Sequence, residues 1–330
     1  MSMVYLESPS TEPDFNLALE QYVFDKLPRS NEYFMLWQND NAIIVGKHQN
    51  TAEEINSDYV KEKGINVVRR ITGGGAVYHD LGNLNYTFII KGLEKSEFDF
   101  RKFTMPIIRA LKKLGVESKL SGRNDITIDG RKFSGNAQAV KNGKLLHHGT
   151  LLFDSKMEEL AKALKVSEDK FRSKGVKSVR ARVTNIKDYL KDDISVSEFK
   201  ELLLKYMFDE DTELREGELS KEAMDEINSL TERKYMSWDW NYGESPEFNV
   251  KQGNRFEGGK IEVLANIKDG IIRGIKFYGD FFGSGSLEEV ESALIGKRYE
   301  NEEIRSALAK LNIEEYFKNI TIDDIVSCIL

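Results

Sequence analysis

Three consecutive glycines, Gly73-Gly74-Gly75, are the feature that most limits how this chain can fold. Glycine loses more backbone entropy on folding than any other residue, so such a run is favoured only where backbone approaches a ligand closely or takes positive φ. Arg69 and Arg70 precede the run, and His79 and Asp80 follow it. Amides beside guanidinium groups suit a phosphate or a carboxylate. We therefore expect an anion-binding loop between two strands; a glycine-rich turn with solvated arginines is the alternative.

Composition excludes several classes of protein. The 330 residues suggest two domains, and 40% hydrophobic residues can form a core. A net charge of −7 argues against nucleic acid as a partner. The single cysteine, Cys328, cannot form an internal disulfide and fits a reducing compartment. Because neither a signal-peptide pattern nor an apolar run of about 20 residues is present, we expect a cytoplasmic protein that does not enter a membrane.

Helical spacing of apolar residues predicts an α+β protein with several helices. Thr11 or Asp14 can cap the first helix, and Gly64 can end the second. Ser195 and Glu198 have the spacing of a capping box. The expected helices cover residues 14–24, 51–63, 99–115, 156–205, 286–294 and 302–311.

Short β-forming runs separated by turn residues predict strands between these helices. Gln-Asn-Asp-Asn divides residues 33–37 from 42–45, which indicates a hairpin. Asp129-Gly130 and Asp269-Gly270 are each typical of a two-residue hairpin turn. The expected strands are 67–70, 84–90, 126–128, 131–133, 145–153, 261–267 and 271–277.

The stretch 238–259 has no clear periodicity, so we place a linker near residues 243–253. Residues beyond it alternate as a hairpin and then become helical, which indicates a small α+β unit. The expected domains are therefore 1–245 and 246–330.

Several familiar catalytic patterns are absent from the sequence. It contains neither a Gly-x-Ser-x-Gly elbow nor a His-Glu-x-x-His metal motif, and it has no Walker sequence. Adjacent His147 and His148 would point to opposite faces of a strand and so share a metal poorly. If a nucleotide binds, another kind of cradle must hold it.

Lys132 is the second candidate centre. Gly135 follows it and permits close backbone approach, and Asn136 and Gln138 supply amide donors and acceptors. A lysine at this place can put a positive charge between two anions. An exposed strand lysine is the alternative.

Other polar residues admit two interpretations each. His79 with Asp80 can be a general base with its orienting partner, or a turn histidine bonded to backbone. Asp125 can hold Mg²⁺ or a ribose hydroxyl, or cap a turn. Asn83 and Asn85 can orient a substrate. Of the basic residues, Arg180 and Arg182 can reach a phosphate or stay solvated.

Four segments together resemble the motifs of the lipoate–protein ligases: residues 69–83, 130–138, 146–152 and 180–185. The resemblance covers nearly the whole chain and implies the catalytic fold shared with biotin ligases and class II aminoacyl-tRNA synthetases. That fold has mixed, largely antiparallel sheets with flanking helices, and here a small C-terminal accessory domain follows. The implied activity is adenylation of lipoate with Mg²⁺ and ATP, then transfer of the lipoyl group to a lysine.

The resemblance also implies partners and site residues. The acceptors would be lipoyl domains of the glycine-cleavage carrier protein or of 2-oxo-acid dehydrogenase acyltransferase subunits. Independently of the resemblance, we expect a monomer. Lys132 would touch both the lipoate carboxylate and the α-phosphate. The residues expected to contact ATP are Arg70, Gly75, Ala76, Val77, Tyr78 and Lys132. Those expected to contact lipoate are Lys132, Gly74, Gly75, His79 and His148. Supporting residues are Asn83, Asp125, Asn136 and Arg182, and Asp125 is also the candidate metal ligand.

Further expectations concern the apolar slot and motion. Val77, Tyr78 and Phe34 are candidates for the wall around the lipoyl chain. Because acyl adenylates hydrolyse, we expect a loop over residues 172–182 to cover the intermediate and the accessory domain to move.

Three alternatives remain. An ATP-independent octanoyl or lipoyl transferase of the same fold would need an internal cysteine. A biotin ligase shares the fold, but the glycine-rich and lysine motifs fit lipoate better. A non-catalytic lipoate-binding protein would bind without releasing pyrophosphate.

Overall fold

The computed structural model describes residues 2–91, 99–122, 124–164, 182–208, 212–243 and 248–330. The chain forms two compact units. Unit 1 contains Met1–Ile44, Ala52–Val68 and Val77–Asn241, and unit 2 contains Val45–Thr51, Arg69–Ala76 and Tyr242–Leu330. The triglycine run therefore packs with the C-terminal part of the chain, although it is far from that part in sequence.

The elements up to residue 241 are both strands and helices, and several strands follow one another directly. In chain order they are β1 (Ser2–Glu7), α1 (Pro13–Lys26), β2 (Glu32–Trp37), β3 (Ala42–Val45), α2 (Thr51–Glu54), α3 (Ser57–Lys63), β4 (Asn66–Arg69), β5 (Val77–His79), β6 (Asn83–Lys91), α4 (Phe100–Lys113), β7 (Lys119–Ser121), β8 (Asp125–Ile128), β9 (Arg131–Lys141), β10 (Lys144–Leu152), α5 (Met157–Ala163), the 3₁₀ turn η1 (Lys187–Tyr189), α8 (Val196–Met207), β11 (Glu213–Glu216), α9 (Lys221–Leu230), the π-helical turn η2 (Thr231–Tyr235) and α10 (Trp238–Asn241).

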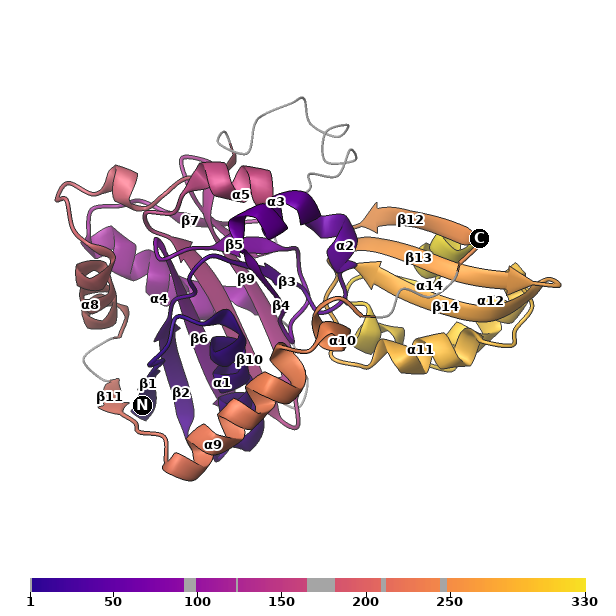
Figure 1. The fold of residues 1–330 in the computed structure, drawn as a ribbon, viewed down its shortest axis with the longest axis horizontal. Coiled ribbons are helices and arrows are strands. Elements are labelled where there is room, and N and C mark those ends of the chain that lie inside the picture. The colour runs from indigo at the N-terminus through magenta and orange to yellow at the C-terminus, as the bar shows by residue number, and fades with distance from the viewer. Residues whose placement is uncertain (1, 92–98, 123, 165–181, 209–211, 244–247) are drawn as a thin grey trace. The chain divides into compact units, whose positions relative to one another are not determined.

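An eight-stranded sheet in the order β11-β1-β2-β6-β10-β9-β8-β7 forms the centre of unit 1. Strand β1 pairs in parallel with its two neighbours, and the other pairs are antiparallel. Side chains alternate between the two faces, so β6 sends Tyr86 and Phe88 into the apolar core with α4 and α8. Thr87 faces the side covered by α1 (Figure 1). One face of the sheet thus packs on the apolar core, and the other packs beneath α1, where Thr87 and Glu20 are buried.

The predicted hairpin over residues 33–45 is wrong. Strand β2 pairs with β1 and β6, whereas β3 lies in a separate three-stranded sheet ordered β4-β3-β5. Both runs are almost wholly buried, so each needs neighbours of its own. Asn39 between them is fully buried and bonds to Asn16 and His79 side chains instead of closing a tight turn.

The other helix and turn predictions have mixed outcomes. The helix expected over 51–63 is two helices, because Asn56 caps α3 by accepting from the Tyr59 amide; Gly64 ends it with φ 58° as predicted. Neither expected side chain caps α1, whose N-cap position is Glu12. The helix 99–115, the strands 84–90 and 145–153 and the Ser195 capping box are confirmed.

The prediction that 156–205 is helical is only partly confirmed, because the described helices there are α5, η1 and α8, with irregular chain between η1 and α8. Residues 165–181 lie outside the described part. The hairpin of β8 and β9 is confirmed, with Asp129 and Gly130 both at positive φ. Lys132 therefore pairs with Thr127 beside a register shift of this ladder, which falls between Ile126 and Thr127.

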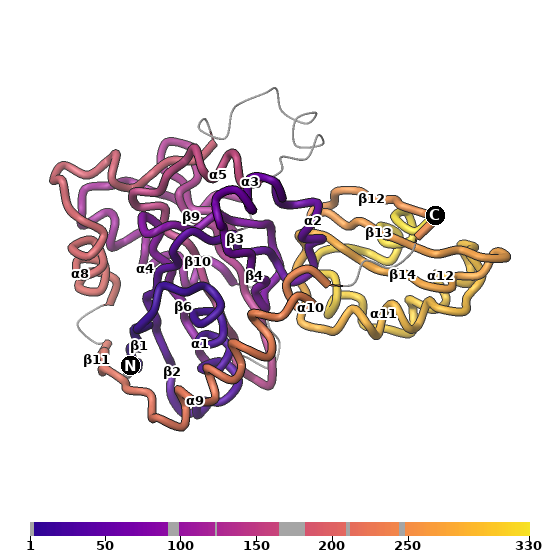
Figure 2. The backbone as a smooth tube through the Cα atoms, in the orientation of Figure 1, coloured from indigo at the N-terminus to yellow at the C-terminus, as the bar shows by residue number. Residues whose placement is uncertain are grey.

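Unit 2 is a three-stranded antiparallel sheet covered by helices. Its core includes Phe277, Phe281 and Phe317. Figure 2 shows the C-terminus beside the first of these strands, where Gln252 donates to the Leu330 carbonyl at 3.2 Å. The elements are β12 (Val250–Phe256), β13 (Gly259–Lys268), β14 (Ile271–Gly279), α11 (Leu287–Leu294), α12 (Asn301–Leu308), α13 (Ile313–Tyr316) and α14 (Ile322–Ile329).

The linker prediction is partly wrong, because β12 begins inside the stretch 243–253. Its residues alternate poorly since both faces of this edge strand are largely exposed. The hairpin of β13 and β14 about Asp269-Gly270 is confirmed. Among the described residues, none of the helices combines the length and apolar character that crossing a membrane requires.

Candidate active site

Lys132 is held near the start of β9 by contacts on both sides. Its Nζ atom lies 2.8 Å from Oδ1 of Asp125 on β8, and these side chains are 36% and 37% exposed. Val183 forms a parallel bridge with Lys132, and the Thr184 amide donates to the Lys132 carbonyl at 2.9 Å. The backbone is thus fixed while the amine stays accessible to a ligand.

The lysine side chain extends over Gly135. A Cβ at position 135 would lie 2.8 Å from Lys132 Nζ and 3.0 Å from its Cε. The Gly135 amide donates to Thr150 Oγ1 at 3.2 Å, and Thr150 pairs with Asn85 on β6. The amine therefore lies on the sheet face that carries Thr150 and Asn85, and glycine at 135 leaves room for it.

Asn136 belongs to a buried network that joins β6, β9 and β10. Its Nδ2 donates to the Asn124 carbonyl at 3.0 Å, and its Oδ1 accepts from Tyr86 and from His147 Nε2. Gln138 Nε2 donates to His147 Nδ1 at 2.9 Å. Burial holds the pKa of His147 well below its usual value, so this ring is neutral. The network fixes the strand from which Lys132 projects.

His148 points to the opposite face, as the strand period requires. Its Nδ1 lies 2.9 and 3.0 Å from the two carboxylate oxygens of Glu20 on α1. Thr87 donates to the same carboxylate at 2.6 Å, and Trp37 Nε1 donates to Thr87 at 2.9 Å. Sequence reasoning missed Glu20, because a helical glutamate is usually solvated and its only signal is its place on an apolar helix.

His79 and Asp80 serve different partners. Asn39 donates to His79 Nδ1 at 3.1 Å, and this histidine lies on β5 rather than in a turn. Asp80 accepts from the Gly82 amide at 3.0 Å and from the Lys156 amide at 2.7 Å. These two bonds of Asp80 stabilise a turn, and they do not support a His79–Asp80 catalytic pair.

Asn83 and Asn85 each carry a buried polar atom that has no hydrogen-bond partner within the described residues. Asn83 Nδ2 donates to Asn85 Oδ1 at 2.9 Å. Asn83 Oδ1 and Asn85 Nδ2 are buried, and neither has a hydrogen-bond partner within the described residues. Such an unpaired group costs about 1–3 kcal/mol. Because Asn85 pairs with both Trp37 and Thr150, these atoms border the face on which the lysine amine lies.

Arg69 in unit 2 binds backbone carbonyls. It donates to those of Gly46, Lys47 and Gln49 at 2.9, 3.1 and 2.7 Å, and to Thr51 Oγ1 at 2.7 Å. Burial lowers its pKa to about 10, so it remains charged at neutral pH. These bonds give Arg69 a structural role, where the sequence suggested an anion-facing guanidinium.

Arg70 organises the triglycine run itself. It donates to Thr72 Oγ1 at 3.0 Å and to the carbonyls of Gly73 and Gly75 at 2.8 and 2.9 Å. Gly74 has φ 95°, which confirms the need for glycine there. No described atom lies within 4 Å of a Cβ placed on Gly75, so the space beside the Gly75 backbone is open.

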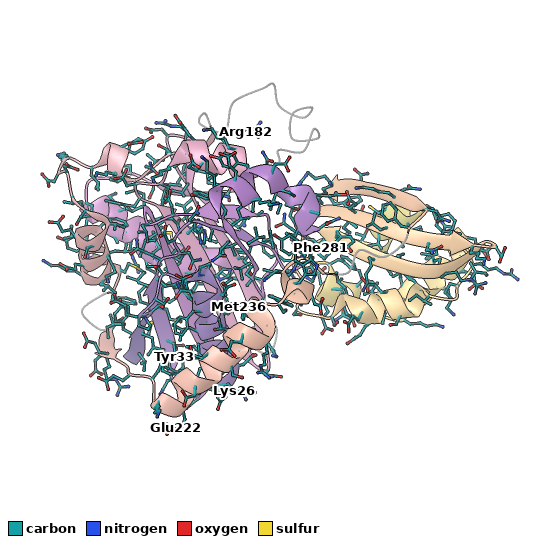
Figure 3. All side chains as sticks on the ribbon, viewed as in Figure 1. Lys26, Tyr33, Arg182, Glu222, Met236 and Phe281 are labelled. Atoms are coloured by element: carbon teal, nitrogen blue, oxygen red, sulfur yellow. The ribbon has the colours of Figure 1, made fainter. Side chains whose placement is uncertain are left out.

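The residues predicted for ATP and lipoate are divided between the units. Arg70, Gly74, Gly75 and Ala76 lie in unit 2, and the rest of both sets lies in unit 1. Tyr78 and Val77 are on β5, and Arg182 is exposed immediately before the Val183 bridge (Figure 3). Arg180 and nearly all of the expected covering loop, 172–181, lie outside the described residues.

Phe34 does not line the polar face. It is fully buried in the core, with its ring 4.8 Å from Phe88 and 5.1 Å from Phe208. Because side chains alternate along β2, Phe34 and Trp37 face opposite sides of the sheet. The expectation that Phe34 forms a wall of the lipoyl slot is therefore wrong.

Asp125 is a limited candidate for a metal ligand. The described residues contain no group of three or more histidine, cysteine, aspartate or glutamate side chains that could hold an ion. Mg²⁺ commonly uses only one or two carboxylates together with substrate phosphates. Asp125 fits that mode, in which the nucleotide brings the ion.

Comparisons with known proteins agree over both parts of the chain. The family described as "Lipoyl protein ligase A/B catalytic domain" matches residues 12–208, and "Bacterial lipoate protein ligase C-terminus" matches residues 245–329. The lipoate-protein ligase LplJ of Bacillus subtilis is 46% identical over 330 residues, which cover 99% of this chain and 100% of that protein.

Solved structures give the same result. P. falciparum LipL1 in complex with lipoate superposes with a TM-score of 0.77 at 28% identity, covering 99% of this chain and 98% of that one. A lipoate-protein ligase A bound with ATP gives 0.65 at 27% identity, covering 74% and 99%. With two family matches in sequence order and a relative identical at nearly half its positions, this chain belongs to the lipoate–protein ligase family.

Proposed function

We propose that this enzyme activates lipoate with ATP to form lipoyl-AMP and pyrophosphate, and then transfers the lipoyl group to a lysine of an acceptor lipoyl domain. Family membership supports the reaction class, and the lipoate and ATP bound in two similar structures support the substrates. The observation that carries the proposal is the position of the Lys132 amine. It lies over Gly135, on the face bordered by the Asn83 and Asn85 atoms that have no partner among the described residues.

In the first step a lipoate carboxylate oxygen would attack the α-phosphorus, forming an O–P bond as the bond to pyrophosphate breaks. The two reacting groups are both anionic and repel each other. A fixed ammonium between them lowers this repulsion most in the transition state, where negative charge concentrates. Lys132 would supply that charge, and Asp125 would hold its Nζ in place until the anions arrive.

In the second step the neutral amine of the acceptor lysine would attack the acyl carbon. AMP leaves, an amide bond forms and the amine loses a proton. Positioning of the two reactants can supply much of this rate. The acceptors we propose are lipoyl domains of the glycine-cleavage carrier protein or of 2-oxo-acid dehydrogenase acyltransferases.

The remaining assignments are proposals of the same kind. Mg²⁺, held with the nucleotide phosphates and Asp125, would neutralise phosphate charge. The domains would be 1–245 and 246–330, and the protein would be a cytoplasmic monomer. Residues proposed to contact ATP are Arg70, Gly75, Ala76, Val77, Tyr78 and Lys132; those for lipoate are Lys132, Gly74, Gly75, His79 and His148; Asn83, Asn136 and Arg182 would support them.

A cysteine-dependent transferase is disfavoured. Cys328 is the only cysteine in the sequence, and it is fully buried in α14. Burial raises the pKa of its thiol, which reduces the thiolate needed for attack. ATP-independent acyl transfer through this residue is therefore not supported.

Lipoate-dependent exchange of pyrophosphate into ATP tests the proposal. Wild-type protein should catalyse exchange, and Lys132→Ala should reduce it by at least about a hundredfold, as expected for loss of a transition-state charge. Lys141→Ala is the matched control, because Lys141 lies on the same strand but pairs with Asp25 at the surface. Lipoate binding without exchange would indicate a binding protein, and unimpaired exchange in Lys132→Ala would remove this lysine from the mechanism.

A further inference from the structure

Within unit 2, two aromatic residues that follow β14 pack against the triglycine run. A Cβ on Gly73 would lie 2.3 Å from the Phe281 carbonyl oxygen and 3.0 Å from the Phe282 ring. A Cβ on Gly74 would lie 3.6 Å from the same ring. Glycine at 73 is therefore required by a close approach of the C-terminal chain, independently of any ligand.

The segment 45–51 is tied to the same place. The His48 ring stacks on the Phe281 ring, with centroids 4.9 Å apart and planes 9° from parallel. The Gly279 amide donates to the His48 carbonyl at 2.7 Å. Phe281 is fully buried and His48 is 7% exposed, so water is largely excluded from this stack.

His48 acts as an apolar ring at this position. Its Nε2 is buried and has no hydrogen-bond partner within the described residues. Burial, with lesser contributions from the charges of Lys47 and Arg69, holds the pKa of His48 well below its usual value. The ring is consequently neutral and contributes packing rather than charge.

Segment 45–51 in turn holds the triglycine loop. The Lys47 amide donates to the Thr72 carbonyl at 2.8 Å, and the Arg70 amide donates to the Val45 carbonyl at 3.0 Å. A Cβ on Gly46 would lie 2.0 Å from the Gly74 carbonyl oxygen. One packed layer thus runs from Phe281 through His48 to the backbone around Gly74.

We propose that Phe281 and His48 are positioning residues for the nucleotide-binding loop, so that the C-terminal part of the chain sets the loop conformation that ATP requires. This inference rests on the proposed function, because it assigns the 69–76 loop to ATP. Neither ring touches the reacting atoms in this account. Loss of the stack should raise KM for ATP by roughly tenfold or more, since misplaced binding groups lose contact with the ligand, while kcat changes less.

Phe281→Leu and Phe277→Leu make a matched pair. Both rings pack on the Phe317 ring, with centroid distances of 4.8 Å for Phe281 and 5.5 Å for Phe277. The two differ in that Phe281 is the ring on which His48 stacks. Both variants should lower the unfolding temperature to a similar extent. KM for ATP, measured in lipoate-dependent pyrophosphate exchange, should rise in Phe281→Leu and stay near the wild-type value in Phe277→Leu. Equal KM values in the two variants would overturn the inference.

His48 provides a second test that does not alter the C-terminal core. His48→Phe keeps a stacked ring and should retain KM for ATP, whereas His48→Ala should raise it. A His48→Ala variant with unchanged KM would also overturn the inference. Absence of exchange in the wild type would instead contradict the proposed function, so the two failures are distinguishable.

Discussion

Lys132 Nζ lies 2.8 Å from Asp125 Oδ1, and the two side chains are 36% and 37% exposed. An ion pair this accessible contributes only about 0–1 kcal/mol to folding stability. The main effect of the ion pair is therefore to position the Lys132 amine. An arriving anion can then replace Asp125 as the partner of that amine. Activity and stability should consequently respond differently to changes at this pair.

Asp125→Asn should lower kcat for pyrophosphate exchange by about tenfold, because an amide side chain does not hold the Lys132 ammonium by charge. Its unfolding temperature should stay close to that of the wild type. Exchange kinetics and thermal unfolding measure the two effects. Asp25→Asn is the control, since Asp25 pairs at the surface with Lys141 at 3.0 Å. An Asp125→Asn enzyme with wild-type kinetics would show that the pair has no catalytic role.

Gly135→Ala should impair activity while the protein still folds. The added methyl group would lie 2.8 Å from Lys132 Nζ, which is the mobile end of a long side chain and can move away. The amine would then lie out of place, and exchange should fall by about ten- to a hundredfold. Gly274→Ala is the control, because its Cβ would meet only Asn266 Cβ at 3.9 Å. Full activity in Gly135→Ala would contradict the placement of the amine.

Gly149→Ala should instead destabilise unit 1. Its Cβ would lie 2.3 Å from Asn136 Oδ1 and 2.6 Å from the Tyr86 ring, both of which are buried. Overpacking of this kind costs about 1–3 kcal/mol. Urea unfolding followed by circular dichroism should show a lower midpoint than for Gly274→Ala. Equal midpoints would mean that the Asn136 network relaxes without cost.

Stability should fall as the pH drops below about 6.5, the usual pKa of histidine. His147 is buried and its folded-state pKa is held well below that value, so the unfolded chain binds a proton that the folded protein excludes. Its contribution is complete above pH 6.5 and is lost as the pH falls, at up to about 1.4 kcal/mol per pH unit. Urea unfolding at pH 7.5, 6 and 5 measures this slope.

His147→Gln is the comparison that isolates this residue. The variant should be less stable at pH 7.5 but lose less stability on acidification. Taking the difference between the two proteins cancels other groups, such as Asp14, whose carboxyl pKa burial raises to about 6. Identical slopes would show that His147 is not the source of the pH dependence.

The sequence correctly predicted the turns and helix ends that depend only on neighbouring residues. Asp129-Gly130, Gly64 and the Ser195 capping box each act within a few residues, and each was predicted correctly. Residues 33–45 were misread because pairing in a sheet depends on distant partners such as β6. The turn-like residues there include Asn39, whose burial by contacts from α1 and β5 cannot be seen locally.

The residues of the candidate site also differ in whether neighbouring sequence could predict them. Lys132 could be singled out because Gly135 and Asn136 follow it at once in the sequence. Glu20 could not, because its partners His148 and Thr87 come from two other elements more than 60 residues away. Arg69 was misjudged for a related reason: the carbonyls that it binds are supplied by a loop about 20 residues earlier, which the sheet brings back.

The packing of residues 45–51 and 69–76 with the C-terminal unit has a consequence for recombining relatives. A chimera joined at residue 241 would combine a foreign C-terminal segment, 242–330, with the native glycine loop, and the His48–Phe281 contact would then join residues from different parents. Exchanges that carry both short segments along with residues 242–330 would preserve that contact. The part of the chain to exchange as one piece is therefore discontinuous in the sequence.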